Sequence, residues 1–99
     1  MEEGLQSDER FAENFVHHRV SKGQGPIKIE QELHQRGVDQ DIINRFLFSG
    51  LIDWQVLAEE IRAKKFGEVV VDDYQNKAKQ SRFLYSRGFS GEIINQLLK

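Results

Sequence analysis

The stretch that decides the fold of this chain is LHQRGV at residues 33–38, because it returns as LYSRGF at residues 84–89. In both copies a polar residue follows and then the sequence IIN, at residues 42–44 and 93–95. A glycine after a run of helix-forming residues, with an apolar residue behind it, is typical of a Schellman helix ending. Two such endings in the same setting predict that the chain contains two copies of one helical unit.

The similarity between the two copies continues toward the N-terminus of each. Matching positions are Phe11 and Leu57, Ala12 and Ala58, Phe15 and Ile61, and Arg19 and Lys65. The second copy carries a short insertion near residues 66–72, which we assign to a loop because loops tolerate insertions. The chain therefore divides into an N-terminal tail at residues 1–7, a three-helix repeat at residues 8–50 and a second three-helix repeat at residues 51–99.

Local signals define the helices of the first repeat. Apolar residues at helical spacing predict a first helix over residues 8–22. Pro26 begins the second helix, since proline at the first helical position loses no hydrogen bond, and Gly37 follows its end. Asp39 is the expected N-cap of the third helix.

The second repeat shows the same signals. The expected caps and ends are Asp53, then Asp72 or Asp73, then Gly88, and finally Ser90. The run of valines at residues 69–71 favours a strand, but so short a run without a partner strand makes no sheet. We expect a loop there whose valines cover the core of the repeat. The predicted fold is all-α, with tandem three-helix repeats forming an elongated helical array.

Composition excludes several classes of protein. The 99 residues include no cysteine, which removes disulfides, thiol catalysis and cysteine zinc sites. No apolar run reaches the ~18 residues that a membrane-spanning helix needs, so we expect no membrane association. The N-terminus is acidic at Glu2 and Glu3 and lacks the apolar segment of a secretory signal. These features favour a cytoplasmic protein.

The charge of the chain is slightly negative and unevenly distributed. The formal net charge is −2, of which residues 1–50 carry −3 and residues 51–99 carry +1. This balance argues against simple binding to a nucleic acid backbone and favours protein partners.

No combination of residues predicts catalysis, a metal site or a cofactor. His17 and His18 are adjacent, so on a helix their side chains point about 100° apart and cannot readily chelate one ion. The glycines of GQG at residues 23–25 have the spacing of a phosphate loop, but the flanking motif is missing, so we interpret the segment as a turn. Asp72 and Asp73 could attract a cation, and capping is the simpler interpretation.

One long ordered pattern resembles the central repeat of the RecX family. It reads DERFA at residues 8–12, Arg19, KGQGP at 22–26, Ile29, EL at 32–33 and RGV at 36–38. The second half resembles the third repeat of that family, through DW at residues 53–54, LA at 57–58, KFGE at 65–68, RFL at 82–84 and RGF at 87–89. The resemblance covers residues 5–99. RecX proteins usually carry a first repeat ahead of this pattern, so contacts made by that repeat are expected to be missing here.

The resemblance implies a binding protein rather than an enzyme, with no cofactor. RecX proteins lie along the groove of the filament that the RecA recombinase forms on DNA. They restrain its ATP hydrolysis, strand exchange and coprotease activity, which belong to recombination, DNA repair and the SOS response. The alternative from the residues alone is a stand-alone helical nucleic-acid-binding module, since short helices joined by glycine-containing turns suit that class. The oligomeric state stays open, with a monomer favoured.

Basic residues recur at matching positions of the two repeats. The expected partner-binding residues are Arg19, Lys22, Lys28, Arg62, Lys64, Lys65, Lys79, Arg82 and Phe83. Repeated charge could form a basic stripe that meets an acidic surface in the RecA groove, or DNA phosphates. The alternative is a solvated helix face with pairs such as Glu60 and Lys64.

Two other pairs of residues have competing interpretations. Arg36 and Arg87 lie at predicted helix ends, where the helix dipole explains a cation. Phe83 and Tyr85 are aromatic where the first repeat has Glu32 and His34. Either one of them is exposed as an interface anchor, or both pack under the loop at residues 69–71.

Overall fold

The chain forms two three-helix units in sequence. The structure is a computed structural model that describes residues 2–67 and 73–98, with side chains from residue 8 onward. Its helices are α1 (Glu2–Ser21), α2 (Pro26–Gln35), α3 (Gln40–Leu47), α4 (Trp54–Phe66), α5 (Tyr74–Ser86) and α6 (Gly91–Leu97). The described residues contain no strand. The prediction of an all-α fold built from tandem three-helix repeats is confirmed.

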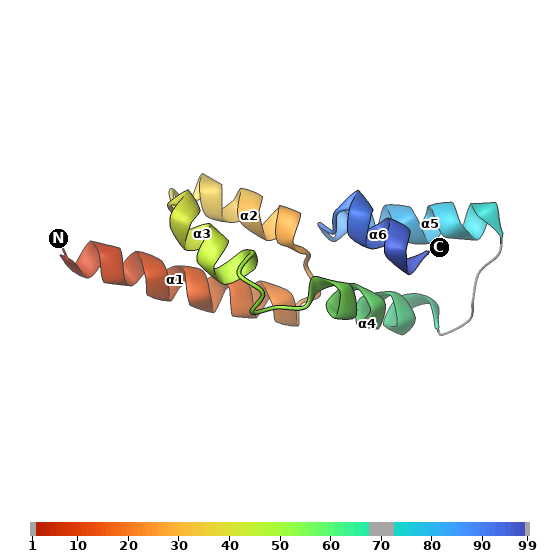
Figure 1. Ribbon diagram of the computed structural model, residues 1–99, viewed down its shortest axis with the longest axis horizontal. Helices are drawn as coiled ribbons and strands as arrows, with labels where there is room; N and C mark the ends of the chain where they lie inside the picture. Colours follow the sequence, from red (N-terminus) through yellow and green to blue (C-terminus); the bar gives the residue numbers. More distant parts are fainter. Residues whose placement is uncertain (1, 68–72, 99) are drawn as a thin grey trace.

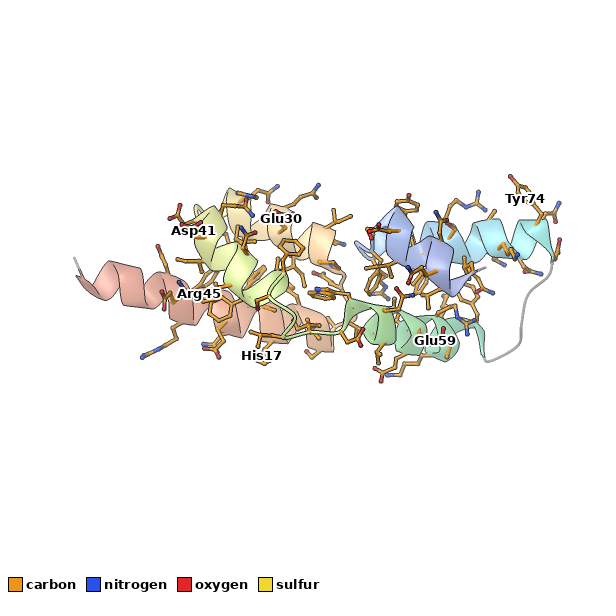
Figure 2. The ribbon with its side chains drawn as sticks, viewed as in Figure 1. His17, Glu30, Asp41, Arg45, Glu59 and Tyr74 are labelled. Carbon is orange, nitrogen blue, oxygen red and sulfur yellow. The ribbon has the colours of Figure 1, made fainter. Side chains whose placement is uncertain are left out.

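Unit one, α1 to α3, closes around an aliphatic core. The side chains with no exposed surface are Ala12, Ile29, Leu33 and Ile43, which come from all three helices. At its surface Arg45 of α3 points toward α1 (Figure 2), where its Nη1 lies 2.8 Å from Oε2 of Glu9. Burial of the core residues from all three helices supplies most of the stability, because short helices are marginal on their own.

Unit two, α4 to α6, has a smaller core of its own. Its fully or almost fully buried members are Ala58, Leu84, Phe89 and Ile94. Trp54, at the start of α4, packs against the cores of both units and donates from Nε1 to the carbonyl oxygen of Leu47 at 2.8 Å. The single tryptophan of the chain therefore links the two cores.

The helix endings that defined the repeat form as predicted. Gly37 and Gly88 have φ angles of +80° and +100°, which only glycine adopts readily. The following apolar residues close each turn, since the N–H of Val38 donates to Leu33 O at 3.0 Å and that of Phe89 to Leu84 O at 3.1 Å. These are the long-range bonds of the Schellman motif.

The helix starts also follow the sequence signals, with one difference in bonding. The side chains of Asp53, Asp73 and Ser90 accept hydrogen bonds from the first turns of α4, α5 and α6. Asp39 holds the N-cap position of α3, but its side chain accepts no capping hydrogen bond. The predicted valine loop at residues 69–71, and Asp72, lie outside the described residues.

The first helix is longer than the sequence predicted. It begins at Glu2, whereas the spacing of apolar residues placed its start at Asp8 and assigned residues 1–7 to a tail. No proline interrupts this stretch, and the one glycine, Gly4, costs only about 1 kcal/mol relative to alanine in a helix. The helix can therefore continue beyond the last core-facing residue.

The two units lie end to end and form a rod of 55 × 19 × 18 Å. In Figure 1, α1 and α4 follow one another along one side of the rod, while the C-terminal end of α5 meets the N-terminal end of α2. At this joint the N–H groups of Gly25 and Ile27 donate to the carbonyl oxygens of Arg87 and Gly88, at 2.6 and 2.9 Å. The predicted elongated array is thus held by backbone hydrogen bonds between units.

The joint requires glycine at position 25. A Cβ atom there would lie 2.5 Å from the carbonyl carbon of Gly88 and 2.7 Å from the N of Phe89. Both neighbours are backbone atoms that cannot move aside without shifting α5. The predicted turn at residues 23–25 is therefore a turn, as expected, and also the contact surface between the units.

Candidate partner-binding site

A cleft of about 510 Å³ lies beside the joint, between the end of α1 and the helices α4 and α5. We call it the interunit cleft. Its charged residues are Lys22, Glu60, Lys64, Lys65 and Arg87. Its apolar residues are Val20, Leu57, Ile61 and Phe83. Among the lining residues that the structure describes, cations outnumber carboxylates four to one, which gives this surface a positive charge.

The ring of Phe83 is surrounded by cations on the side of the cleft. Lys65 Nζ lies 5.5 Å and Arg87 Cζ lies 5.2 Å from its centroid, within the range of cation–π attraction. Phe66 meets the same ring edge-on, with centroids 5.4 Å apart. The guanidinium of Arg87 also donates to Lys22 O at 3.4 Å, which ties the cleft to the joint.

The structure brings four of the predicted partner-binding residues together. Lys22, Lys64, Lys65 and Phe83 all line the interunit cleft, although they come from three separate segments of the chain. Their contact with a partner stays a prediction, but their proximity is a property of the fold. Lys28 lies next to the joint, since a Cβ added to Gly88 would lie 2.5 Å from the Cβ of Lys28.

Arg19 interacts within its own unit. Its Nε lies 3.2 Å from Oε1 of Glu32, and its Cζ lies 4.6 Å from the centroid of the Phe15 ring. These contacts connect α1 to α2 and give Arg19 a structural role.

Arg62 is nine-tenths buried and connects the helices of unit two. Its Nη2 lies 2.7 Å from Oε2 of Glu59, and its Nη1 donates to Gln80 Oε1 at 3.4 Å and to Gly67 O at 3.5 Å. The hydrogen bond from Arg62, with its charge, lowers the pKa of the Glu59 carboxyl below the ordinary value, against the opposing effect of burial. This network joins α4 to α5.

The two remaining cations, Lys79 and Arg82, are exposed on α5 outside the lining of the cleft. The exposed aromatic residue is Tyr85, which is 57% exposed, whereas Phe83 is partly buried against the core of unit two. One of the two aromatic residues, Tyr85, is therefore exposed, and the other, Phe83, lines the cleft. A role for either residue as an interface anchor stays a prediction.

Sequence reasoning missed the part played by Arg87 in this cleft. Arg87 and Arg36 occupy equivalent positions, and both follow the last residue of a helix, as the dipole argument expected. Only Arg87 faces a neighbouring unit. Arg36 lies over the rings of Phe11 and Phe15 instead, at 5.8 and 5.2 Å.

Within residues 8–67 and 73–98 no group of three histidine, cysteine, aspartate or glutamate side chains is placed to hold a metal ion. His17 and His18 are both exposed, and His17 points away from α2 and α3 (Figure 2). In the described part of the chain, every helix is too short or too polar to cross a membrane.

The fold and the interunit cleft define the class of protein: a tandem three-helix repeat with a positively charged cleft between its units. Comparison with protein families then matches residues 7–47 to the second three-helix domain of RecX and residues 53–98 to the third. The chain belongs to the RecX family.

Individual relatives agree with this assignment. The chain is similar to the regulatory protein RecX of Halorhodospira halophila, with 44% identity over 94% of this chain and 58% of that protein. It is 42% identical to the RecX of Pseudomonas entomophila and 45% identical to that of Chromohalobacter salexigens, in each case over 98% of this chain and 63% of the relative. The chain thus spans less than two thirds of the length of these relatives.

Proposed function

We propose that this chain binds the filament that RecA forms on DNA and lowers its ATP hydrolysis, strand exchange and coprotease activity. The observation that carries the proposal is that two RecX domains together cover residues 7–98. The chain acts by binding, without a cofactor and without catalysis of its own, as a monomer in the cytoplasm.

The shape of the molecule supports this function. A filament presents the same surface at regular intervals, and a rod 55 Å long can contact more than one copy of it. Because the joint fixes the two units relative to one another, contacts made by one unit raise the effective concentration of the other at its own surface. Modest contacts from each unit then combine into useful affinity.

The test is co-sedimentation of the purified chain with RecA filaments assembled on single-stranded DNA. We expect the chain in the pellet only when RecA and DNA are both present, and a slower DNA-dependent ATP hydrolysis when the chain is in excess. A folded chain that stays in the supernatant, and leaves ATP hydrolysis unchanged at large molar excess, would rule the function out.

A second candidate, a stand-alone nucleic-acid-binding module, is favoured by one observation. Lys22, Lys64, Lys65 and Arg87 line a single cleft, and phosphates are attracted to such clusters. The net charge of −2 opposes it. A salt-dependent mobility shift of a short DNA duplex without RecA would support this candidate, and binding that requires RecA would exclude it.

A further inference from the structure

One pair of equivalent positions differs in chemistry between the two units. Arg19 matches Lys65 along the repeat, and Glu32 matches Phe83. In unit one these positions form an ion pair, with Arg19 Nε 3.2 Å from Glu32 Oε1. In unit two they form a cation–π contact, with Lys65 Nζ 5.5 Å from the centroid of the Phe83 ring. Unit two therefore keeps the cation of the pair and lacks its carboxylate.

The other cations of the interunit cleft also have no carboxylate partner among the described residues. Among the residues that the structure describes, Lys22, Lys64, Lys65 and Arg87 form no ion pair within 4.0 Å. In the same part of the chain Arg19, Arg45 and Arg62 are each paired with a glutamate. Glu60, the single carboxylate among the described residues of the cleft lining, cannot balance four cations. The cleft is thus complementary to a negatively charged group.

The floor of the cleft indicates which anionic group fits. Val20, Leu57 and Ile61 supply aliphatic surface directly beside the cations. A volume of about 510 Å³ lies within the range of pockets that take several side chains, about 300–1,000 Å³. Mixed aliphatic and cationic walls suit a peptide in which acidic and aliphatic residues are neighbours, because each kind of side chain finds its own partner.

A nucleic acid strand fits the same walls less well. Bases bind to proteins by stacking on aromatic faces, and Phe83 is the only aromatic residue among the described residues of the cleft lining. Lys65 and Arg87 already lie within 5.5 Å of its centroid, and Phe66 meets it edge-on. A stacked base would have to displace one of these cations.

We propose that the interunit cleft binds an acidic peptide segment of the protein partner, in which a carboxylate takes beside Lys65 the place that Glu32 holds beside Arg19. Lys22, Lys64 and Arg87 receive further carboxylates of the segment, and an aliphatic side chain of the segment packs on Ile61. This inference rests on the proposed function, since it names the kind of partner surface that the RecX chain recognises.

The sharpest test supplies the missing carboxylate from within the chain. Phe83→Glu recreates in unit two the pair that Arg19 and Glu32 form in unit one, so Lys65 becomes neutralised and no longer needs a partner. Phe83→Gln is the matched control, because it removes the same ring and adds no charge. We expect Phe83→Glu to bind RecA filaments about tenfold more weakly than Phe83→Gln in co-sedimentation. Equal binding by the two variants would overturn the proposal.

A second pair of variants keeps the test valid should position 83 prove sensitive to folding. Lys64→Glu with Lys65→Glu reverses the charge of the cleft at two exposed side chains. The control, Arg10→Glu with Lys77→Glu, reverses the same charge outside the cleft, at two cations that are not among the expected partner-binding residues. We expect the first double variant to lose filament binding about tenfold or more and the second to bind like the wild type. Equal losses would show a general charge effect and overturn the assignment to the cleft.

Two further measurements separate failure of this inference from failure of the proposed function. If the wild-type chain does not bind filaments, the proposed function is wrong. The chemistry of the cleft is then tested without RecA, by nuclear magnetic resonance titration of the wild-type chain with a peptide of alternating glutamate and leucine. Amide shifts at Gly23, Lys64 and Lys65 that vanish with a glutamine–leucine peptide support the cleft chemistry. No shifts at millimolar peptide, or the same shifts with a single-stranded oligonucleotide alone, refute it.

Discussion

Replacing Gly25 with alanine tests whether the two units are held together by the backbone joint. The new Cβ would lie 2.5 Å from Gly88 C, 2.6 Å from Gly88 O and 2.7 Å from Phe89 N, all of them backbone atoms. Relief requires α2 and α5 to separate, which stretches the bonds that Gly25 and Ile27 donate across the joint. Phe89, a core residue of unit two, would meet the new Cβ through its backbone N and not through its side chain, so each unit should stay folded.

The magnitude follows from three contributions. Overpacking against fixed atoms costs about 1–3 kcal/mol. Weakening two backbone hydrogen bonds adds about 1 kcal/mol each. Alanine reduces the freedom of the unfolded chain relative to glycine, which returns about 0.4–1 kcal/mol, since φ at Gly25 is −87° and suits alanine. The net loss in the free energy of unfolding should be about 2–5 kcal/mol.

The assay is urea denaturation followed by the fluorescence of Trp54, which packs against the cores of both units. We expect a lower midpoint and emission shifted to longer wavelength before the main transition. Gly91→Ala is the control, because its Cβ would meet only the hydroxyl end of the exposed Tyr85, which can move away. If Gly25→Ala matches the wild type in both midpoint and emission, the joint does not hold the units and the reasoning is wrong.

Three other predictions concern the individual units. Leu33→Ala, which empties a fully buried site in unit one, should reduce the free energy of unfolding by about 2–5 kcal/mol in calorimetry, and a loss below about 1 kcal/mol would show that the core is not packed as described. Ser90→Ala removes the side-chain cap of α6 and should cost about 1 kcal/mol in thermal unfolding, with Ser90→Asp retaining most of the stability. The Glu59 carboxyl has a lowered pKa in the folded chain, so its contribution to stability is fully present above its ordinary pKa of 4.5 and declines as the pH falls toward the folded value. Glu59→Gln should therefore flatten the stability curve of the chain below pH 4.5, and an unchanged curve in equilibrium unfolding would contradict the pairing with Arg62.

The units themselves could be predicted from the sequence because their signals are local. A glycine such as Gly88, followed by Phe89, specifies the end of a helix within a few residues, and Ser90 specifies the start of the next. Because the two units share one sequence pattern, each signal found in one unit predicts the matching feature of the other. The early start of α1 was missed because no core contact marks it in the sequence.

The joint and the cleft could not be predicted, because they depend on contacts between residues far apart in the chain. Gly25 resembled an ordinary turn residue until Gly88 was placed against it. Repeated charge also does not reveal the partner of each cation. Arg19 and Lys65 match in sequence, yet among the described residues Arg19 is the one of the two that has a glutamate beside it. The difference lies in the partner position, where Phe83 replaces Glu32.

The joint also gives the rod a polarity. In its two backbone hydrogen bonds, unit one contributes the N–H groups, from Gly25 and Ile27, and unit two contributes the carbonyl oxygens, from Arg87 and Gly88. The equivalent turn of unit one, at Gly37, has open space where a Cβ would lie, at the opposite end of that unit. A helical unit joined by the same bonds could add there in one orientation only, so the two faces of unit one that take part in such joints are chemically distinct: one offers N–H groups and the other offers carbonyl oxygens.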